Sequence, residues 1–253
     1  MPFDEQAAIG EFWDARARGE YFPPQWFDRL TLDQAYRIQL GIIARRVAAG
    51  ERQVGWKVGL TAEPIQQQFG FHEPVFGCIL DSKPSGHVFQ RDELIRPGFE
   101  PELCLRVDQA LSGEVDAATV RGAIDAVYPA LEIIETRGDL STQIAVAMAD
   151  NAQQKTVVLG NPVALGGLAL DEVAATVRIN GNTAATGRGD AVIGNPLNSV
   201  IWLARKLQQF GRDIQAGEII MSGSFTRQFP IEPGDRVEVD FVGVGGVRTA
   251  MLG

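Results

Sequence analysis

Phe99-Glu100-Pro101-Glu102-Leu103-Cys104-Leu105-Arg106-Val107 is the stretch that decides the fold, because it is typical of a β-strand and carries two carboxylates one residue apart. Strand side chains alternate in direction, so Glu100 and Glu102 are expected on the same face. Carboxylates that share a face repel each other unless one is protonated or a cation lies between them. The stretch therefore predicts a strand that helps to hold a hard divalent metal ion.

A third carboxylate, Glu132, lies within the apolar run Pro129–Ile134, where a bare charge is costly. Exposed glutamates in salt bridges are the ordinary alternative for two glutamates spaced in this way. The apolar setting of Glu132 favours the metal, and three carboxylates together with water suit Mg²⁺ or Mn²⁺. Glu135, three residues on, is expected on the other side of the strand in a structural role.

The composition is that of an ordinary globular protein, with 45% hydrophobic and 22% charged residues in 253. A net charge of −9 and the absence of any Lys/Arg-rich run argue against a nucleic-acid partner. Cys78 and Cys104 lack metal-ligand spacing, which makes a reduced cytoplasmic location the expectation. The N-terminus does not have the pattern of a signal peptide, and no apolar run is long enough to predict a membrane span.

The first part of the chain is predicted to be helical. Three- and four-residue periodicity predicts a helix over residues 4–19. Thr31 and Gln34 form a capping-box pattern for a second helix, with Gly50 at its C-terminal end. Because short β-branched runs and glycines follow from Val54, we expect a helical region over 1–53 and a strand-rich catalytic domain over 54–253.

The strand-rich part is expected to be interrupted by helices over 63–69, 116–127 and 196–210. Asn180-Gly181 predicts a turn between two strands, and residues 237–242 alternate as a strand. The expected fold class is therefore α+β.

Lys57 is the first candidate outside the glutamates. It lies between Trp56 and Val58 in a glycine-bounded strand, where loss of water is expected to lower its pKa into a useful range. It could also hold a substrate carboxylate. A surface lysine that extends its ammonium into water is the competing interpretation.

Two polar segments are ambiguous. Asp150-Asn151 can cap a turn or orient a ligand. A glycine-rich segment that includes Gly187-Arg188 approaches a helix whose N-terminal amides can receive an anion, although it lacks the ending of a phosphate-binding loop. His72 and His87 have no Ser or Cys partner in a recognisable arrangement, so histidine-based nucleophilic catalysis and a zinc site are poorly supported.

An ordered set of short motifs spans nearly the whole chain. The set comprises Gly55-Trp56-Lys57-Val58-Gly59-Leu60-Thr61, Gln66-Gln67-Gln68, Glu100-Pro101-Glu102, Pro129-Ala130-Leu131-Glu132, Ala149-Asp150-Asn151-Ala152, Gly187-Arg188-Gly189, Gly194-Asn195-Pro196-Leu197-Asn198, Trp202-Leu203-Ala204 and Gly217-Glu218-Ile219-Ile220. Together these motifs resemble the 2-keto-4-pentenoate hydratase and 4-oxalocrotonate decarboxylase family of the fumarylacetoacetate hydrolase superfamily.

The resemblance implies a helical N-terminal region, a mixed β-sheet roll around the active site, a Mg²⁺ or Mn²⁺ ion and a homo-oligomer, with a complex with a pathway enzyme as a further expectation. Site residues carry over by motif: Glu100, Glu102 and Glu132 as metal ligands, Lys57, Asp150 and Asn151 as catalytic residues, and Leu60, Gly187 and Arg188 as substrate-binding residues.

Four positions depart from the family pattern, and all four are expected near the substrate: Phe99, Val75, Val146 and Gln153. The activity that the resemblance implies is a metal-dependent hydratase that adds water to a 2-hydroxy-2,4-dienoate to give a 4-hydroxy-2-oxo acid in aromatic-compound catabolism. The alternatives are a 2-oxo-dioate decarboxylase, an acylpyruvate C–C hydrolase and a non-catalytic partner subunit.

Overall fold

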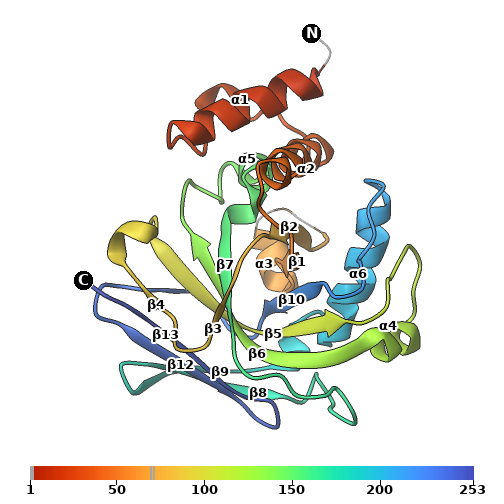
Figure 1. The fold of residues 1–253 in the computed structure, drawn as a ribbon, viewed down its shortest axis with the longest axis vertical. Coiled ribbons are helices and arrows are strands. Elements are labelled where there is room, and N and C mark those ends of the chain that lie inside the picture. Colours follow the sequence, from red (N-terminus) through yellow and green to blue (C-terminus); the bar gives the residue numbers. More distant parts are fainter. Residues whose placement is uncertain (1–2, 69, 71) are drawn as a thin grey trace.

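The computed structural model describes residues 3–253 except 69 and 71, and it begins with a pair of helices (Figure 1). Helix α1 (Glu5–Ala17) is capped by Asp4, whose side chain accepts from the Ala7 amide. Helix α2 (Leu32–Ala48) opens with the predicted capping box of Thr31 and Gln34. A short 3₁₀ turn, η1 (Pro24–Trp26), lies between them. The predicted helical start of the chain is confirmed.

The main body is built on a curled mixed sheet in the order β2-β1-β10-β5-β6-β7-β3, with β11 paired to β5. Its strands are β1 (Gly55–Gly59), β2 (Val75–Ile79), β3 (Ser82–Pro84), β5 (Pro97–Val107), β6 (Ile124–Glu135), β7 (Gln154–Leu159), β10 (Ile219–Ser224) and β11 (Phe229–Pro230). The long antiparallel pair β5 and β6 lies at its centre. The predicted strand around Glu100 is thus the middle of the sheet.

A second sheet, in the order β4-β13-β12-β8-β9, covers the lower part of the body in Figure 1. Its strands are β4 (Val88–Phe89), β8 (Ala174–Ile179), β9 (Asn182–Arg188), β12 (Arg236–Phe241) and β13 (Gly245–Met251). Asn180 and Gly181, both with positive φ, make the predicted turn between β8 and β9. The mixed sheets and the separate helices confirm the α+β class.

The remaining helices are α3 (Glu63–Gln68), α4 (Ala117–Ala123), α5 (Ile144–Ala149) and α6 (Pro196–Gln208), with 3₁₀ turns η2 (Arg91–Glu93), η3 (Asn151–Gln153) and η4 (Gly189–Ala191). The end of the helix predicted over 63–69 lies outside the described residues. The helix predicted over 116–127 is too long, because β6 begins at Ile124. The residues from Ile124 onward extend the β5–β6 ladder, and their pairing in the sheet outweighs their helical propensity.

One hydrophobic core joins the N-terminal helices to the sheet. The rings of Tyr36 on α2 and Phe76 on β2 stack with centroids 4.1 Å apart. The buried amide of Gln39 donates to the carbonyls of Phe76 and Met148 at 3.3 and 2.7 Å. The helical region therefore packs directly on the β2 and α5 side of the main body.

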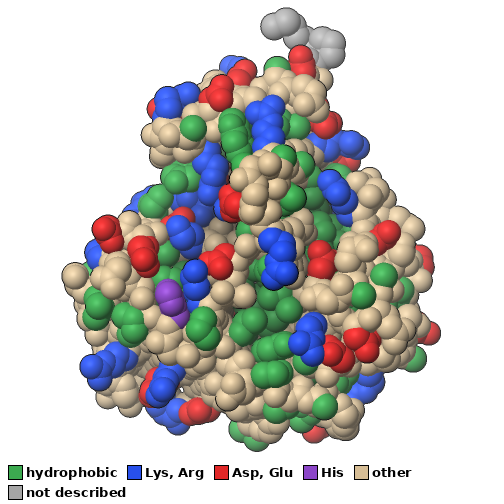
Figure 2. Space-filling view, in the orientation of Figure 1, with side chains coloured by type: hydrophobic (Ala, Val, Ile, Leu, Met, Phe, Trp, Pro, Cys, Tyr) green, Lys and Arg blue, Asp and Glu red, His purple; other side chains and the backbone are tan. Residues whose placement is uncertain are grey.

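In Figure 2 basic and acidic side chains are interspersed over the visible face. Within the described part of the chain, no helix has the length and apolarity needed to cross a membrane.

Candidate metal centre

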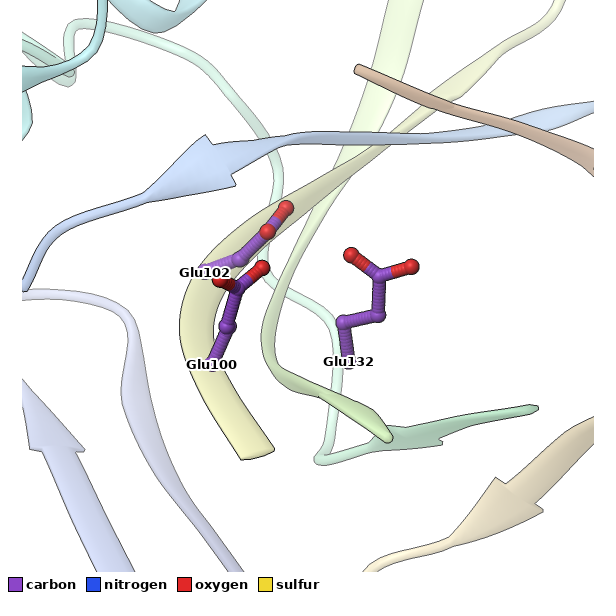
Figure 3. A group of neighbouring side chains, drawn as sticks. All are labelled: Glu100, Glu102 and Glu132. Carbon is purple, nitrogen blue, oxygen red and sulfur yellow. The ribbon is translucent and has the colours of Figure 1, made fainter. Parts of the chain in front are cut away.

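Glu100 and Glu102 on β5 and Glu132 on β6 turn their carboxylates toward one common space (Figure 3). Glu100 and Glu132 are direct partners in the antiparallel ladder. Each of the three offers a carboxylate oxygen, and these oxygens all lie within 4.8 Å of one another. The structure therefore brings Glu132 together with the two glutamates that the sequence analysis placed on one face of a strand.

Glu102 is held in place by an irregularity in the neighbouring strand. The β10–β5 register shifts between Met221 and Ser224, and the Gly223 amide in this bulge donates to Oε2 of Glu102 at 2.8 Å. Gly223 has a φ of 115°, and a Cβ there would lie 2.5 Å from Thr61. Glycine is required at this position both by the backbone and by the close packing.

Glu132 is the member that most needs a cation. Its side chain is 0% exposed, and neither of its oxygens accepts a hydrogen bond from the described residues. Its one ion pair among the described residues, with Lys57, leaves Oε2 without a partner, and a buried ionised carboxylate so poorly compensated is strongly unfavourable. A hard divalent ion would supply the missing partner, so the donor set and the burial both fit Mg²⁺ or Mn²⁺.

The electrostatics of the cluster point the same way. Burial raises the pKa of Glu132 to about 7, with Lys57 opposing the shift and Glu100 adding to it. Burial also raises the pKa of Glu100, and it raises the pKa of Glu102 well above its ordinary value with help from the neighbouring glutamates. Without a metal the cluster resists full ionisation, as expected of three carboxylates that share one buried space.

Lys57 lies beside the cluster on β1. Its Nζ is 3.4 Å from Oε1 of Glu132, and its side chain is almost fully buried. Burial alone would lower the pKa of the ammonium, but Glu132, Glu100 and Glu102 together raise it above its ordinary value. The expectation of a lowered pKa is wrong for the metal-free chain, because the sequence did not show that three carboxylates face the lysine. Lys57 is thus an ammonium held at the edge of the centre.

A cavity of about 540 Å³ opens from the cluster. Glu100 is the glutamate that lines it, and Lys57 reaches it past Gly59, where a Cβ would lie 3.2 Å from Nζ. Its apolar wall is formed by Leu60, Val75, Ile134, Leu140, Met148 and Ala152, and its polar wall by Arg96, Thr136, Asp139, Ser141, Gln153 and Gln228. The space has the mixed lining of a small-molecule site.

Asp150 and Asn151 do not line this cavity. The Asp150 carboxylate is buried in ion pairs, 2.5 Å from Nε of Arg137 and 3.4 Å from an amino group of Arg16. The Asn151 side chain accepts from the amide of Cys78 at 2.7 Å and donates to its carbonyl at 2.8 Å. These contacts hold the chain at Asp150 and Asn151, immediately before the residues that form part of the cavity wall.

The following turn is left-handed over Asn151, Ala152 and Gln153, with φ values of 56°, 49° and 59°. Such conformations cost about 1–3 kcal/mol per non-glycine residue and persist only where the surroundings enforce them. Here Arg137 enforces the turn, because it donates to the Asp150 carbonyl while its own amide donates to the Gln153 side chain. The turn sets Ala152 and Gln153 into the cavity wall.

The three expected substrate-binding residues are placed differently. Leu60 lines the cavity. Gly187 does not line it, and lies so close to the backbone of Phe225 that a Cβ would be 2.2 Å from its carbonyl oxygen. The Arg188 side chain is exposed, and its Nε lies 3.4 Å from Oδ2 of Asp190. Only Leu60 of the three is in contact with the space beside the metal centre.

The four departures from the family pattern also divide. Val75 and Gln153 line the cavity, as expected. Phe99 instead stacks on Phe229 with ring centroids 5.4 Å apart, and Val146 is buried in the core on α5. The expectation that all four lie at the substrate is therefore wrong for Phe99 and Val146, whose side chains are taken up by apolar packing.

Sequence reasoning missed Arg96 and Gln228, which line the cavity beside Glu100. Arg96 lies four residues before Glu100, an even spacing that would place it on the same face of an extended strand. That spacing could have identified Arg96 as a candidate site residue. Gln228 is distant in sequence, and no comparable feature pointed to it.

A curled mixed sheet with three convergent glutamates and a lysine defines an α+β protein with a candidate centre for a hard divalent metal. The chain is 36% identical over 255 residues to 2-keto-4-pentenoate hydratase of Paraburkholderia xenovorans (strain LB400), covering 98% of this chain and 95% of that protein. It is 33% identical over 228 residues to 4-oxalocrotonate decarboxylase of Pseudomonas sp. (strain CF600), covering 88% and 86% of the two chains.

Among solved structures, 4-oxalocrotonate decarboxylase from Pseudomonas putida G7, complexed with calcium and acetate, matches with a TM-score of 0.91 at 31% identity. The match covers 98% of this chain and 97% of that one. The fumarylacetoacetate (FAA) hydrolase C-terminal family matches residues 66–251. The chain belongs to this family, which confirms the resemblance drawn from the motifs.

Proposed function

We propose that the protein is a metal-dependent lyase that hydrates a 2-hydroxy-2,4-dienoate to a 4-hydroxy-2-oxo acid. One observation carries the proposal: the buried Glu132, whose oxygens have no hydrogen-bond partner among the described residues, faces Glu100 and Lys57 at the inner end of a ligand-sized cavity. The names of the hydratase and decarboxylase relatives support the same chemistry.

Glu100, Glu102 and Glu132 would hold Mg²⁺ or Mn²⁺. When bound, such an ion supplies electrostatic stabilisation for the negative charge that develops on the 2-oxygen of a 2-oxo acid. The apolar wall, including Leu60 and Val75, would hold the carbon chain of the substrate in a fixed orientation.

Lys57 is proposed as the proton donor. Because the glutamates raise its pKa, it carries a proton at neutral pH and lies at the boundary between the centre and the cavity. Protonation of the dienol at a carbon gives the enone, and water then adds at the conjugated position. Asp150 and Asn151 are proposed as positioning residues, because their side chains bind Arg137 and the Cys78 backbone rather than line the cavity.

Gly187 and Arg188 remain expectations from the family motif, and we propose for them a role in positioning β9 rather than direct substrate contact. The homo-oligomer and the complex with a pathway enzyme also remain proposals, and light scattering of the purified protein can test the first of them. The two cysteines are unpaired and buried, which fits the cytoplasmic location we propose.

Decarboxylation of a 2-oxo-dioate is the second candidate, because the same centre would stabilise the enolate left after loss of CO₂. Hydrolysis of an acylpyruvate ranks lower, since no histidine is among the described residues that line the cavity. The experiment is a parallel assay of dienoate, 2-oxo-dioate and acylpyruvate substrates with Mg²⁺ or Mn²⁺. Metal-dependent turnover of the dienoate, lost in Glu100→Gln, is the expected result. Silence on all three substrates with metal bound would favour a non-catalytic subunit.

A further inference from the structure

The wall of the cavity is a ladder of cross-strand pairs that leads away from the metal centre. Glu100 faces Glu132, the next pair on the same face is Gly98 and Ile134, and the Thr136 amide then donates to the Arg96 carbonyl at 3.2 Å. β5 begins at Pro97 and rises about 3.3 Å per residue, so Gly98 lies roughly 7 Å along the strand from Glu100, and Arg96 lies just beyond the start of the strand. Arg96 and the glutamates thus stand at opposite ends of one wall.

The middle of the wall is kept open for a polar side chain. Gly98 has no side chain, and a Cβ there would lie 2.6 Å from Nε2 of Gln228. The Gln228 amide therefore occupies the space between Arg96 and Glu100, and all three line the same cavity. Arg96, Thr136 and Gln228 also line an adjoining cavity of about 350 Å³, which places them at the outer end.

Arg96 differs from the other basic groups near the centre. Lys57 faces Glu132, and Arg137 is committed to Asp150 and Glu135. Within the described residues the Arg96 side chain has no hydrogen bond or ion pair, and its backbone is held at a φ of 40°. Arg96 is exposed and lines the cavity, so an anion bound there can reach its guanidinium without displacing a partner among the described residues.

The charges in the cavity favour a second anion. The Lys57 ammonium and a divalent ion would together balance the three glutamates. Asp139, the other acidic residue that lines the cavity, already accepts from the amide and hydroxyl of Ser141 at 2.9 and 2.6 Å. Arg96 and Arg91 both line the adjoining cavity without an ion pair among the described residues, and of the two only Arg96 also lines the cavity of the metal centre.

We infer that Arg96, with the Gln228 amide beside it, binds a second carboxylate at the far end of the substrate. The substrate class is then a 2-oxo-dioate or its 2-hydroxy-diene tautomer, rather than an acid with a hydrocarbon tail. The inference rests on the proposed function, because that function places the first carboxylate and the 2-oxygen at the glutamates. It is compatible with either hydration or decarboxylation at that end.

The test compares two ligands that differ only in the terminal group, 2-oxoadipate and 2-oxohexanoate, by calorimetric titration of the Mn²⁺-loaded protein. A charged hydrogen bond at a partly open site is expected to give a preference of about tenfold for 2-oxoadipate. Arg96→Gln should abolish this preference and leave the affinity for 2-oxohexanoate unchanged, which also shows that the variant is folded. Arg91→Gln is the matched control, because Arg91 lines only the adjoining cavity.

Each other outcome has a definite meaning. If the wild type binds the two ligands equally, or prefers 2-oxohexanoate, or if Arg96→Gln keeps the preference, the subsite is absent and the proposed function stands. If Arg91→Gln loses the preference to the same extent, the selectivity comes from the general charge of that face, and the assignment to Arg96 is overturned. If neither acid binds the metal-loaded protein, the proposed function itself fails and the subsite with it.

Discussion

Glu100 and Glu132 are direct cross-strand partners, so the centre of the sheet sets two carboxylates against each other in a buried space. Like charges placed directly opposite in a ladder destabilise a sheet. Glu102 adds a third carboxylate from the same face of β5. The fold retains an arrangement that opposes its own stability, and a divalent ion is the partner that would relieve the repulsion.

Glu132→Gln separates the effect of the glutamate pair on activity from its effect on folding stability. Replacing the carboxylate removes a buried charge without hydrogen-bond partners, so the metal-free variant should melt roughly 2–4 °C above the metal-free wild type, the shift expected for about 1 kcal/mol in a chain of this size. Dienoate turnover with Mg²⁺ should fall by at least about a hundredfold. Calorimetry with and without EDTA, together with the dienoate assay, measures both effects.

Glu135→Gln is the matched control on the same strand. Glu135 pairs with Arg137 at 2.9 Å and accepts from the Ile95 amide, so its removal should lower the melting temperature and leave metal binding intact. A Glu132→Gln protein that melts below the wild type and still gains stability from Mg²⁺ would contradict the assignment of the centre.

The stability gained from metal should depend on pH in a defined direction. The pKa of Glu132 is about 7 in the folded protein against an ordinary value of 4.5, so the folded state binds more protons than the unfolded state between these values. The contribution of this group to metal-free stability is therefore fully present below pH 4.5 and is lost as the pH rises through about 7. Metal ligands must be deprotonated, so metal affinity should rise over the same window, by up to about tenfold per pH unit for each proton released.

Melting curves with EDTA and with Mg²⁺, recorded across that window, test the expectation. The gap between the two melting temperatures should widen as the pH increases. The difference is informative because other titrating groups act on both samples alike. A gap that narrows with rising pH, or that is constant, would show that the glutamates are not the groups that bind the ion.

Lys57→Met tests the role of the ammonium independently of the metal. Nζ of Lys57 lies 3.4 Å from Oε1 of Glu132, so the ammonium competes with a metal ion for that oxygen. We expect the variant to bind Mn²⁺ at least as tightly as the wild type and to lose about 10²- to 10⁴-fold in turnover, the usual contribution of a positioned acid. Lys155→Met is the control, because Lys155 pairs with Glu135 at the surface. Retained turnover in Lys57→Met would remove the lysine from the mechanism.

Much of the centre could be predicted from the sequence because its logic is local. The alternation of Glu100 and Glu102 follows from strand geometry, and the apolar run around Glu132 marked a charge that needs a partner. The resemblance then assigned the three glutamates to one metal ion. The capping box of Thr31 and Gln34 was equally local and was equally well predicted.

The remainder depends on contacts between distant segments. The direction of the Lys57 pKa shift required knowledge of three carboxylates on other strands. The opening of the β6 strand at Ile124 depends on pairing with β5, which the helical pattern over 116–127 could not show. Gln228 meets Gly98 only because β11 folds back on β5, so nothing in its own neighbourhood pointed to the cavity.

Asp150→Asn tests whether the Ala149-Asp150-Asn151-Ala152 motif is structural or catalytic. The Asp150 carboxylate is buried between Arg137 and Arg16, so the substitution leaves Glu135 as the one ion-pair partner of Arg137 among the described residues and should cost about 3–5 kcal/mol of folding stability. Turnover per folded molecule at low temperature should stay within a few-fold of the wild type, with a higher KM because the left-handed turn that carries Gln153 is less firmly held. Denaturant unfolding and steady-state kinetics measure the two effects.

Glu20→Gln, which breaks an exposed pair with Arg18, should change stability by less than about 1 kcal/mol. A fully stable Asp150→Asn protein with abolished turnover would instead make Asp150 a catalytic residue, since only a role in the chemistry would then account for the loss.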